Sequence, residues 1–295
     1  MPNNKPTVLV TGATGQIGGD TLRFLQNDDA IELVAAVRSA AKAQPFEARG
    51  IRTVIMDFDH EHSLAPALQG IDRVLLVTGY TVDMLRQSKA FLDSARQAGV
   101  QHVVHLGACG DDAATIGHWA WHQFVERYVE WCGFSFTHLR PECFMQNLLS
   151  YDGTQAVRNG VIEQYTGHTP FSWVDGEDVA RVAAQALLHP QRHAGHTYRL
   201  GYDVKSYGEV AQVMSEVLGQ PFRYDAQSPE VFLDNMRAAG AEMAYMTCVH
   251  DNFTRMAAGT IAGADQVFDN FQAITGREPV RWVDFVRKHR AAFAY

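Results

Sequence analysis

The stretch Thr7-Val8-Leu9-Val10-Thr11-Gly12-Ala13-Thr14-Gly15-Gln16-Ile17-Gly18 decides the fold of this chain. Its apolar first half predicts a buried strand, and the glycines that follow at GxxGxxG spacing predict a tight turn into a helix. Such a turn lets the backbone approach a pyrophosphate and points the amides at the helix N-terminus toward its negative charge. The alternative is a tight strand-to-helix turn that binds no ligand.

The composition restricts the classes of function. The 295 residues are 46% hydrophobic and carry a formal net charge of −8, which disfavours a binder of nucleic acid or of an anionic membrane. The four cysteines form no CxxC pair, so we expect reduced thiols in a cytoplasmic protein. No apolar leader segment precedes the first strand, and no apolar run is long enough to span a bilayer. We expect a monomer or homodimer that acts on a small molecule.

Apolar runs alternate with helical patterns through the first half of the chain. This order predicts a parallel sheet that is covered by helices on both faces, which is a doubly wound α/β Rossmann domain. The expected strands are 7–11, 32–37, 53–56, 73–77, 102–106, 135–139 and 197–200, and the expected helices of this half are 16–26, 63–68, 83–98 and 118–132.

The texture of the sequence changes after Leu149. Turn residues fill 151–170, and the later helical patterns are 178–188, 206–218, 229–239 and 280–292. We therefore predict a dinucleotide-binding domain over 1–150 with a return segment at about 171–200. A smaller C-terminal α+β lobe is expected over 151–170 and 201–295.

The end of the second strand predicts which nicotinamide cofactor binds. An acidic residue there would bond a ribose 2′-hydroxyl and repel a 2′-phosphate, but this strand ends in Val37-Arg38-Ser39. Arg38 can make charge-assisted bonds to a phosphate, and Lys42 follows one turn later. The sequence therefore predicts NADP(H) rather than NAD(H), unless Arg38 is an ordinary solvated side chain.

The tips of the third and fourth strands add further candidates. Asp57 would accept a bond from the adenine amine while Phe58 lies against the ring, although a simple turn is nearly as good an interpretation. Thr78 and Gly79 leave room for a ribose, and Tyr80 would point toward the substrate or lie on the surface. The complete set of residues that we expect to contact the cofactor is Gly12, Thr14, Gly15, Gln16, Ile17, Gly18, Arg38, Asp57, Phe58, Thr78, Gly79, Gly107, Pro141 and Phe144.

Three segments together carry a family resemblance. The opening strand and turn with Val37-Arg38-Ser39, the stretch 137–147 (Thr-His-Leu-Arg-Pro-Glu-Cys-Phe-Met-Gln-Asn) and the stretch 171–180 (Phe-Ser-Trp-Val-Asp-Gly-Glu-Asp-Val-Ala) resemble the NmrA-like branch of the atypical short-chain dehydrogenases. The resemblance covers essentially the whole chain. It implies an NADP-binding Rossmann domain with a smaller C-terminal lobe, in a family that contains both reductases and redox-sensing regulators.

The chain departs from ordinary short-chain dehydrogenases at the catalytic pair. Those enzymes use a Tyr with a Lys four residues later, and no Tyr of this sequence has such a Lys. His118 and His122 stand at the corresponding places, ahead of Glu126. Three interpretations follow: His118 donates a proton while His122 positions the ribose, or hydride passes directly to an electron-poor acceptor, or the pair is structural. We favour direct transfer, with His118 as the first candidate proton donor and Tyr80 as the second.

A metal site is the weaker interpretation of the same segment. His118, His122 and Glu126 are spaced to share one helix face, but no further ligand is evident nearby, and we expect no metal. The histidines 189, 193 and 196 lie in a turn-rich stretch and are expected to be solvated.

Aromatic residues suggest the class of substrate. Pro141 and Phe144 would wall off the nicotinamide, and Trp119, Asn147, Trp173 and Tyr80 are the candidate substrate contacts. We therefore expect an NADPH-dependent reductase that transfers hydride to a small conjugated or aromatic acceptor such as a quinone, enone, imine or dye. The alternative is a non-catalytic NADP(H) sensor that signals through a protein partner.

Overall fold

A computed structural model describes residues 5–149 and 156–295 of the chain. The described residues form two compact units. Unit 1 comprises residues 5–108, 121–140 and 179–198, and unit 2 comprises residues 109–120, 141–149, 156–178 and 199–295. Residues 151–155 of the predicted C-terminal lobe lie outside the described part. The predicted boundaries of the dinucleotide-binding domain and of the C-terminal lobe stay a prediction.

Unit 1 is built around a seven-stranded sheet with the order β11-β6-β5-β4-β1-β2-β3. The ladders from β3 to β6 are all parallel, so the predicted doubly wound parallel sheet is confirmed. The strands are β1 (Thr7–Val10), β2 (Glu32–Val37), β3 (Arg52–Ile55), β4 (Arg73–Val77), β5 (His102–Leu106), β6 (Ser135–Pro141) and β11 (His196–Leu200).

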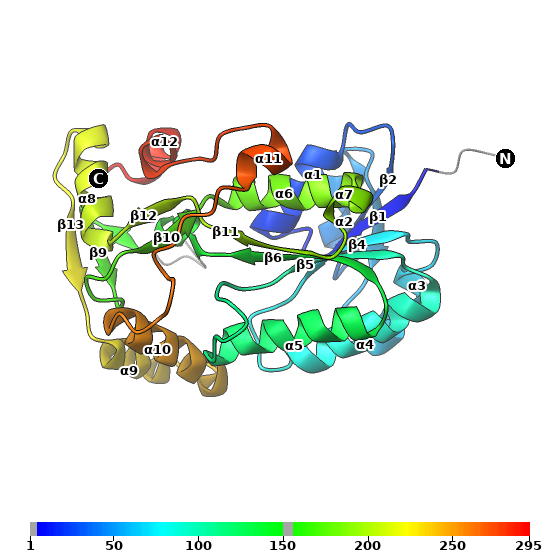
Figure 1. Ribbon diagram of the computed structural model, residues 1–295, viewed down its shortest axis with the longest axis horizontal. Helices are drawn as coiled ribbons and strands as arrows, with labels where there is room; N and C mark the ends of the chain where they lie inside the picture. The colour runs from blue at the N-terminus through cyan, green and yellow to red at the C-terminus, as the bar shows by residue number, and fades with distance from the viewer. Residues whose placement is uncertain (1–4, 150–155) are drawn as a thin grey trace. The chain divides into compact units, whose positions relative to one another are not determined.

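Helices lie on both faces of this sheet, with α1 and α6 on one face and α4 and α5 on the other (Figure 1). They are α1 (Gln16–Leu25), α2 (Ala40–Glu47), α3 (Leu64–Ala67), α4 (Met84–Ala98), α5 (Gly117–Trp131), α6 (Gly176–Leu188) and α7 (Pro190–His193), with a 3-10 turn at Glu61–Ser63. Among the described residues, no helix is both long and apolar enough to cross a membrane.

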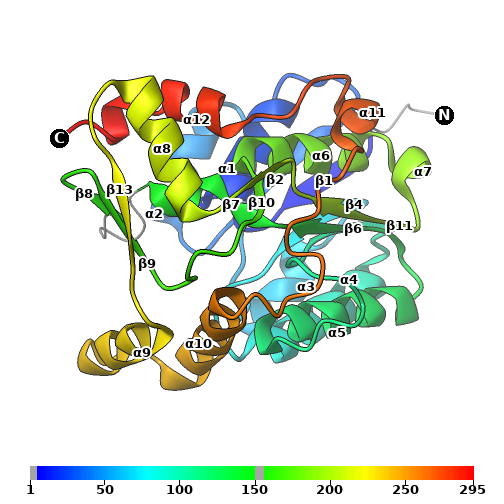
Figure 2. The same ribbon diagram turned by 60° about the vertical axis from the view of Figure 1, so that its left-hand side comes forward.

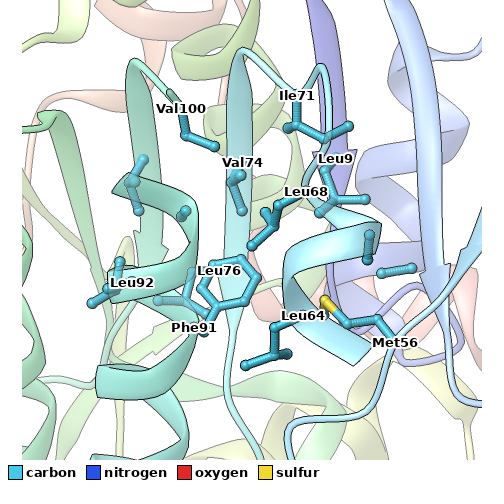
Figure 3. Packing of buried hydrophobic residues seen from close by; sticks show 14 of the residues in the cluster. Leu9, Met56, Leu64, Leu68, Ile71, Val74, Leu76, Phe91, Leu92 and Val100 are labelled. Atoms are coloured by element: carbon cyan, nitrogen blue, oxygen red, sulfur yellow. The ribbon is translucent and has the colours of Figure 1, made fainter. Parts of the chain in front are cut away.

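The core of unit 1 shows why the sequence folds this way. Leu9 of β1 and Val74 and Leu76 of β4 point to the same face of the sheet, because alternate residues of a strand share a face. Leu64 of α3 and Phe91 of α4 cover them, and all five side chains are fully buried (Figure 3).

The order of the strands reverses between β1 and β4. β1 pairs with β2 on one side and with β4 on the other, and all three run parallel. In open α/β sheets, ligands bind outside the carboxyl ends of the strands at such a switch point. The glycine turn after β1 and the Thr78-Gly79 pair after β4 therefore leave the sheet at the place where a dinucleotide would be expected.

Unit 2 contains two small three-stranded sheets, β12-β10-β7 and β13-β9-β8. Its apolar core joins β10 to α8 and α12 through Trp173, Tyr207, Trp282 and Phe285. The elements are β7 (Cys143–Phe144), a 3-10 turn at Met145–Leu148, β8 (Val157–Arg158), β9 (Val161–Gln164), β10 (Phe171–Val174), β12 (Asp203–Lys205), α8 (Tyr207–Leu218), β13 (Arg223–Ala226), α9 (Pro229–Ala238), α10 (Met243–Ala257), α11 (Phe271–Thr275), α12 (Trp282–Lys288) and a 3-10 turn at Arg290–Ala292.

Several elements differ from the sequence-based expectation. β3 begins and ends one residue earlier than expected, and β6 continues through Pro141. The sequence did not predict α2, or α10, which packs beside α9 (Figure 2). α9 and α10 each bury one residue, but α9 begins with Ser228 and Pro229, a helix-start signal that α10 lacks.

Candidate cofactor and acceptor site

The turn after β1 has a shape that only glycine allows at two of its positions. Gly12 has a φ of +62°, and a Cβ at that position would lie 3.0 Å from Val77. Gly18 has no comparable backbone requirement, but a Cβ there would lie 2.3 Å from the carbonyl oxygen of Gly12. The first glycine therefore makes the turn, and the last lets α1 pack directly on it.

The N-terminus of α1 faces outward from this turn. Gly15 is the N-cap residue, and its amide donates a 2.9 Å hydrogen bond to the oxygen of Gly12. A glycine cap has no side-chain oxygen to accept bonds from the amides of the first turn. Thr14, Gly15 and Gln16 are exposed and Ile17 is half-buried, so this helix end presents its amides and its positive dipole to an anion.

Thr11 ties the ends of β1 and β4 together at the switch point. Its hydroxyl donates to the oxygen of Leu75 at 3.0 Å and accepts a 2.8 Å bond from the amide of Val77. Thr78 is half-buried after β4, Gly79 is exposed, and Tyr80 is 65% exposed. The two strand tips that flank the switch point are therefore held in fixed relative positions.

A positive side chain stands at the tip of β2 and an acid at the tip of β3. Arg38 is exposed, and Asp57 is half-buried. The pKa of Asp57 is lowered, first by the amide of Asp59, which donates to its carboxylate at 3.0 Å, and further by His60 and by the charge of Arg38. Phe58 is half-buried and packs edge-to-face on Phe91 of α4, with ring centroids 5.4 Å apart.

A polar cluster is buried between α5 and strands β5 and β6. Nδ1 of His122 lies 3.2 Å from Nε2 of His105, and Arg140 donates to both carboxylate oxygens of Glu126 at 2.9 and 2.5 Å. A Cβ on Gly107 would lie 3.2 Å from the carbonyl oxygen of Leu139 and 3.4 Å from Glu126, so the tight contact at this glycine is with the neighbouring strand β6. His122 is buried against β5, which gives its imidazole a structural partner.

The structure groups potential metal ligands differently from the spacing on α5. His105, Glu126 and His138 bring one ligand atom each to within 4.8 Å of one another, and all three are buried. His118 is not part of this group. The guanidinium of Arg140 contacts both oxygens of Glu126, so a divalent cation beside this carboxylate would meet a like charge.

In unit 2, His118 lies at the start of α5 and contacts a residue from α10. Its ring meets Tyr245 edge-to-face, with centroids 5.6 Å apart and planes at 82°. Burial lowers the pKa of His118 to about 4, so the imidazole is neutral at neutral pH. Trp119 beside it is 8% exposed and packs on Gly110, whose φ is +98°.

The remaining predicted residues of unit 2 have different surroundings. Pro141 is buried, Phe144 is half-buried, and exposed Asn147 donates to the sulfur of Cys143 at 3.5 Å. Trp173 is fully buried, and its Nε1 donates to the oxygen of Lys205 at 2.8 Å. The expectation that the Trp173 side chain contacts substrate is therefore wrong, because the indole fills the core of unit 2.

Sequence reasoning missed His105, Tyr245 and the pair formed by Glu142 and Arg199. His105 is directly paired with His138 in the sheet, a relation that the strand pattern could have revealed. Arg199 donates to one oxygen of Glu142 at 3.0 and 2.7 Å, and burial raises the pKa of this carboxyl to about 7 despite the arginine. Neither this pair nor Tyr245 had a sequence signal, since their partners are distant along the chain.

Comparisons with known proteins agree with this architecture. The model of the NmrA-like family matches residues 4–276. The NAD(P)H azoreductase of Xenophilus azovorans is 34% identical over 291 residues, which cover 97% of this chain and 99% of that protein. Quinone oxidoreductase 2 of Escherichia coli (strain K12) is 26% identical over 273 residues, covering 91% and 92%.

Among solved structures, triphenylmethane reductase of Citrobacter sp. complexed with NADP(H) superposes with a TM-score of 0.80 at 24% identity. The match covers 96% of this chain and 99% of that one. The fold is therefore shared across nearly the full length of both chains. Together with the family match and the azoreductase relative, these findings identify the chain as a member of the NmrA-like family.

Proposed function

We propose that this chain is an NADPH-dependent reductase that transfers hydride to a small conjugated or aromatic acceptor such as a quinone, enone, imine or dye. The observation that carries the proposal is the glycine turn. Because Gly12 and Gly18 have no side chains, the N-terminus of α1 can pack directly against the tip of β1. The azoreductase and quinone oxidoreductase relatives support the class of reaction.

The chain's residues would hold the two phosphate-bearing parts of the cofactor. Gly12, Gly15 and Gly18 would place backbone amides against the pyrophosphate, and Arg38 would bind the 2′-phosphate. Asp57 would accept a bond from the adenine amine. The further cofactor contacts that we propose are Thr14, Gln16, Ile17, Phe58, Thr78, Gly79, Gly107, Pro141 and Phe144.

When bound, the reduced nicotinamide supplies the hydride. The chain supplies no tyrosine–lysine pair, and His118, with its pKa lowered to about 4, carries no acidic proton at neutral pH. This combination favours acceptors whose reduced anion is delocalised, because such an anion takes its proton from water without help. A quinone or an extended dye meets this condition better than an isolated ketone.

The substrate, location and assembly belong to the same proposal. The acceptor would be flat and apolar, with Trp119, Asn147 and Tyr80 as candidate contacts. For an acceptor that does need a protein proton donor, His118, whose imidazole is protonated only at acid pH, would be the first candidate and Tyr80 the second. His122 is buried against His105, which argues for a supporting role. We also propose a cytoplasmic location and a monomeric or homodimeric state for the chain.

The decisive experiment measures NADPH oxidation against a panel of quinones, azo dyes, cationic dyes, enones and aldehydes, with the Kd of NADPH determined in parallel. We expect turnover on the quinones and dyes and little on the aldehydes. Tight NADPH binding with no turnover on any member would refute a reductase and support an NADP(H) sensor instead.

A further inference from the structure

Within unit 2, α10 is fixed against the segment 109–120 at two places. Nη1 of Arg255 donates to the hydroxyl of Thr115 at 3.1 Å, and Asp251 of the same helix accepts from Nε of Arg255. At the other end of α10, Tyr245 contacts His118. These contacts hold a tyrosine ring and a candidate proton donor in one arrangement although they come from distant parts of the chain.

The stripe of α10 that contains Tyr245 is polar as well as aromatic. Asn252 lies seven residues later, which places it on the same face of the helix. Its side-chain oxygen is buried and has no hydrogen-bond partner among the described residues. Because leaving such an oxygen unpaired costs free energy, a donor from a bound molecule would be favoured there.

We propose that Tyr245 is a specificity-determining residue whose ring contacts the aromatic acceptor beside His118. This inference rests on the proposed function, and it assigns the choice of acceptor to Tyr245. The rings of Tyr245 and His118 meet at 82°, Tyr245 is 7% exposed and His118 is half-buried, so an acceptor beside His118 would meet the tyrosine ring at its exposed margin. The neutral imidazole and the aromatic side chains favour an extended apolar ring system over a carboxylate or phosphate.

The test compares Tyr245→Leu, Tyr245→Phe and Phe253→Leu with the unaltered chain. Phe253 is the matched control because it lies on the same helix, but its ring packs on Tyr165 and Phe232 at 5.4 and 5.0 Å. KM and kcat are measured for an azo dye and for cyclohexenone, which has no aromatic ring. The Kd of NADPH and the midpoint of thermal unfolding are measured for each variant.

We expect Tyr245→Leu to raise the KM for the dye about tenfold, the effect of one lost aromatic contact, with little change for cyclohexenone or NADPH. Tyr245→Phe should restore the dye KM because it keeps the ring. Equal losses for both acceptors, no rescue by phenylalanine, or the same loss in Phe253→Leu would each overturn the inference.

Direct dye binding separates this inference from the proposed function. The Kd of the azo dye is measured by equilibrium dialysis with NADP⁺ present, which requires no turnover. If no acceptor is reduced but Tyr245→Leu still weakens dye binding about tenfold, the reductase assignment fails and the contact stands. If dye binding is the same in the two proteins, the contact is refuted whether or not turnover occurs.

Discussion

Substituting Gly18 with alanine tests the glycine turn directly. The new Cβ would lie 2.3 Å from the oxygen of Gly12 and 2.9 Å from that of Thr11, whereas ordinary contact begins at 3.4 Å. The start of α1 must therefore move away from the turn by about 1 Å, since both opposing atoms belong to the backbone. Overpacking of this kind costs about 1–3 kcal/mol. Replacing a helical glycine with alanine returns up to about 1 kcal/mol.

The same displacement moves the first-turn amides away from the expected pyrophosphate. Losing a charge-assisted hydrogen bond costs about 1.5–3 kcal/mol, so the Kd of NADPH should rise roughly 10- to 100-fold. The matched control is Gly19→Ala, whose Cβ would lie 3.3 Å from the oxygen of Ala13. That contact needs only a few tenths of an ångström of adjustment, so NADPH binding should change little and the helix should gain stability.

Fluorescence titration gives the Kd of NADPH, and urea unfolding gives the stability of each variant. If Gly18→Ala binds NADPH as the unaltered chain does, the argument for close approach of α1 to a pyrophosphate is wrong. If Gly18→Ala and Gly19→Ala lose affinity equally, the effect belongs to the helix as a whole.

The remaining predictions concern the charges of the molecule. Arg38→Asp should raise the Kd of NADPH by about 10- to 100-fold more than that of NADH, because only NADPH carries the 2′-phosphate; isothermal titration showing equal losses would remove Arg38 from the site. The rate of dye reduction should not depend on the titration of His118 between pH 6 and 8, because the pKa of His118 is lowered to about 4. The steady-state rate of His118→Ala with the dye should therefore stay near that of the parent. A pH profile of the parent with a pKa near neutrality that disappears in His118→Ala would contradict this. Burial lowers the pKa of His102 to about 4 and of His138 to about 3, so below pH 6.5 the unfolded chain takes up protons that the folded state does not. The free energy of unfolding should therefore fall as the pH drops, by about 1 kcal/mol for each histidine at pH 5.5. Glu142 has the opposite effect on stability, because its pKa is raised to about 7 and its protonation in the folded state adds stability as the pH falls. Glu142→Gln removes this contribution, so its free energy of unfolding in urea should fall more steeply than that of the parent between pH 7.5 and 5.5.

The sequence alone determined the sheet and the side of it at which a dinucleotide is expected. The alternation of apolar runs with helical patterns predicts parallel strands because each strand buried on both faces needs a helix between it and the next. The spacing of Gly12, Gly15 and Gly18 is local, and so is the position of Arg38 at the end of a strand. Such features are readable because the residues that act together are neighbours along the chain.

Only the tertiary structure decided which distant residues meet. His118 and Tyr245 come from separate segments, and α10 itself was not predicted because its start lacks the serine–proline signal that marks α9. Trp173 looked like a candidate substrate contact, but β10 turns it into the core of unit 2. A side chain's spacing along the sequence fixes its face on a helix or strand, whereas its partner is fixed by which other element packs against that face.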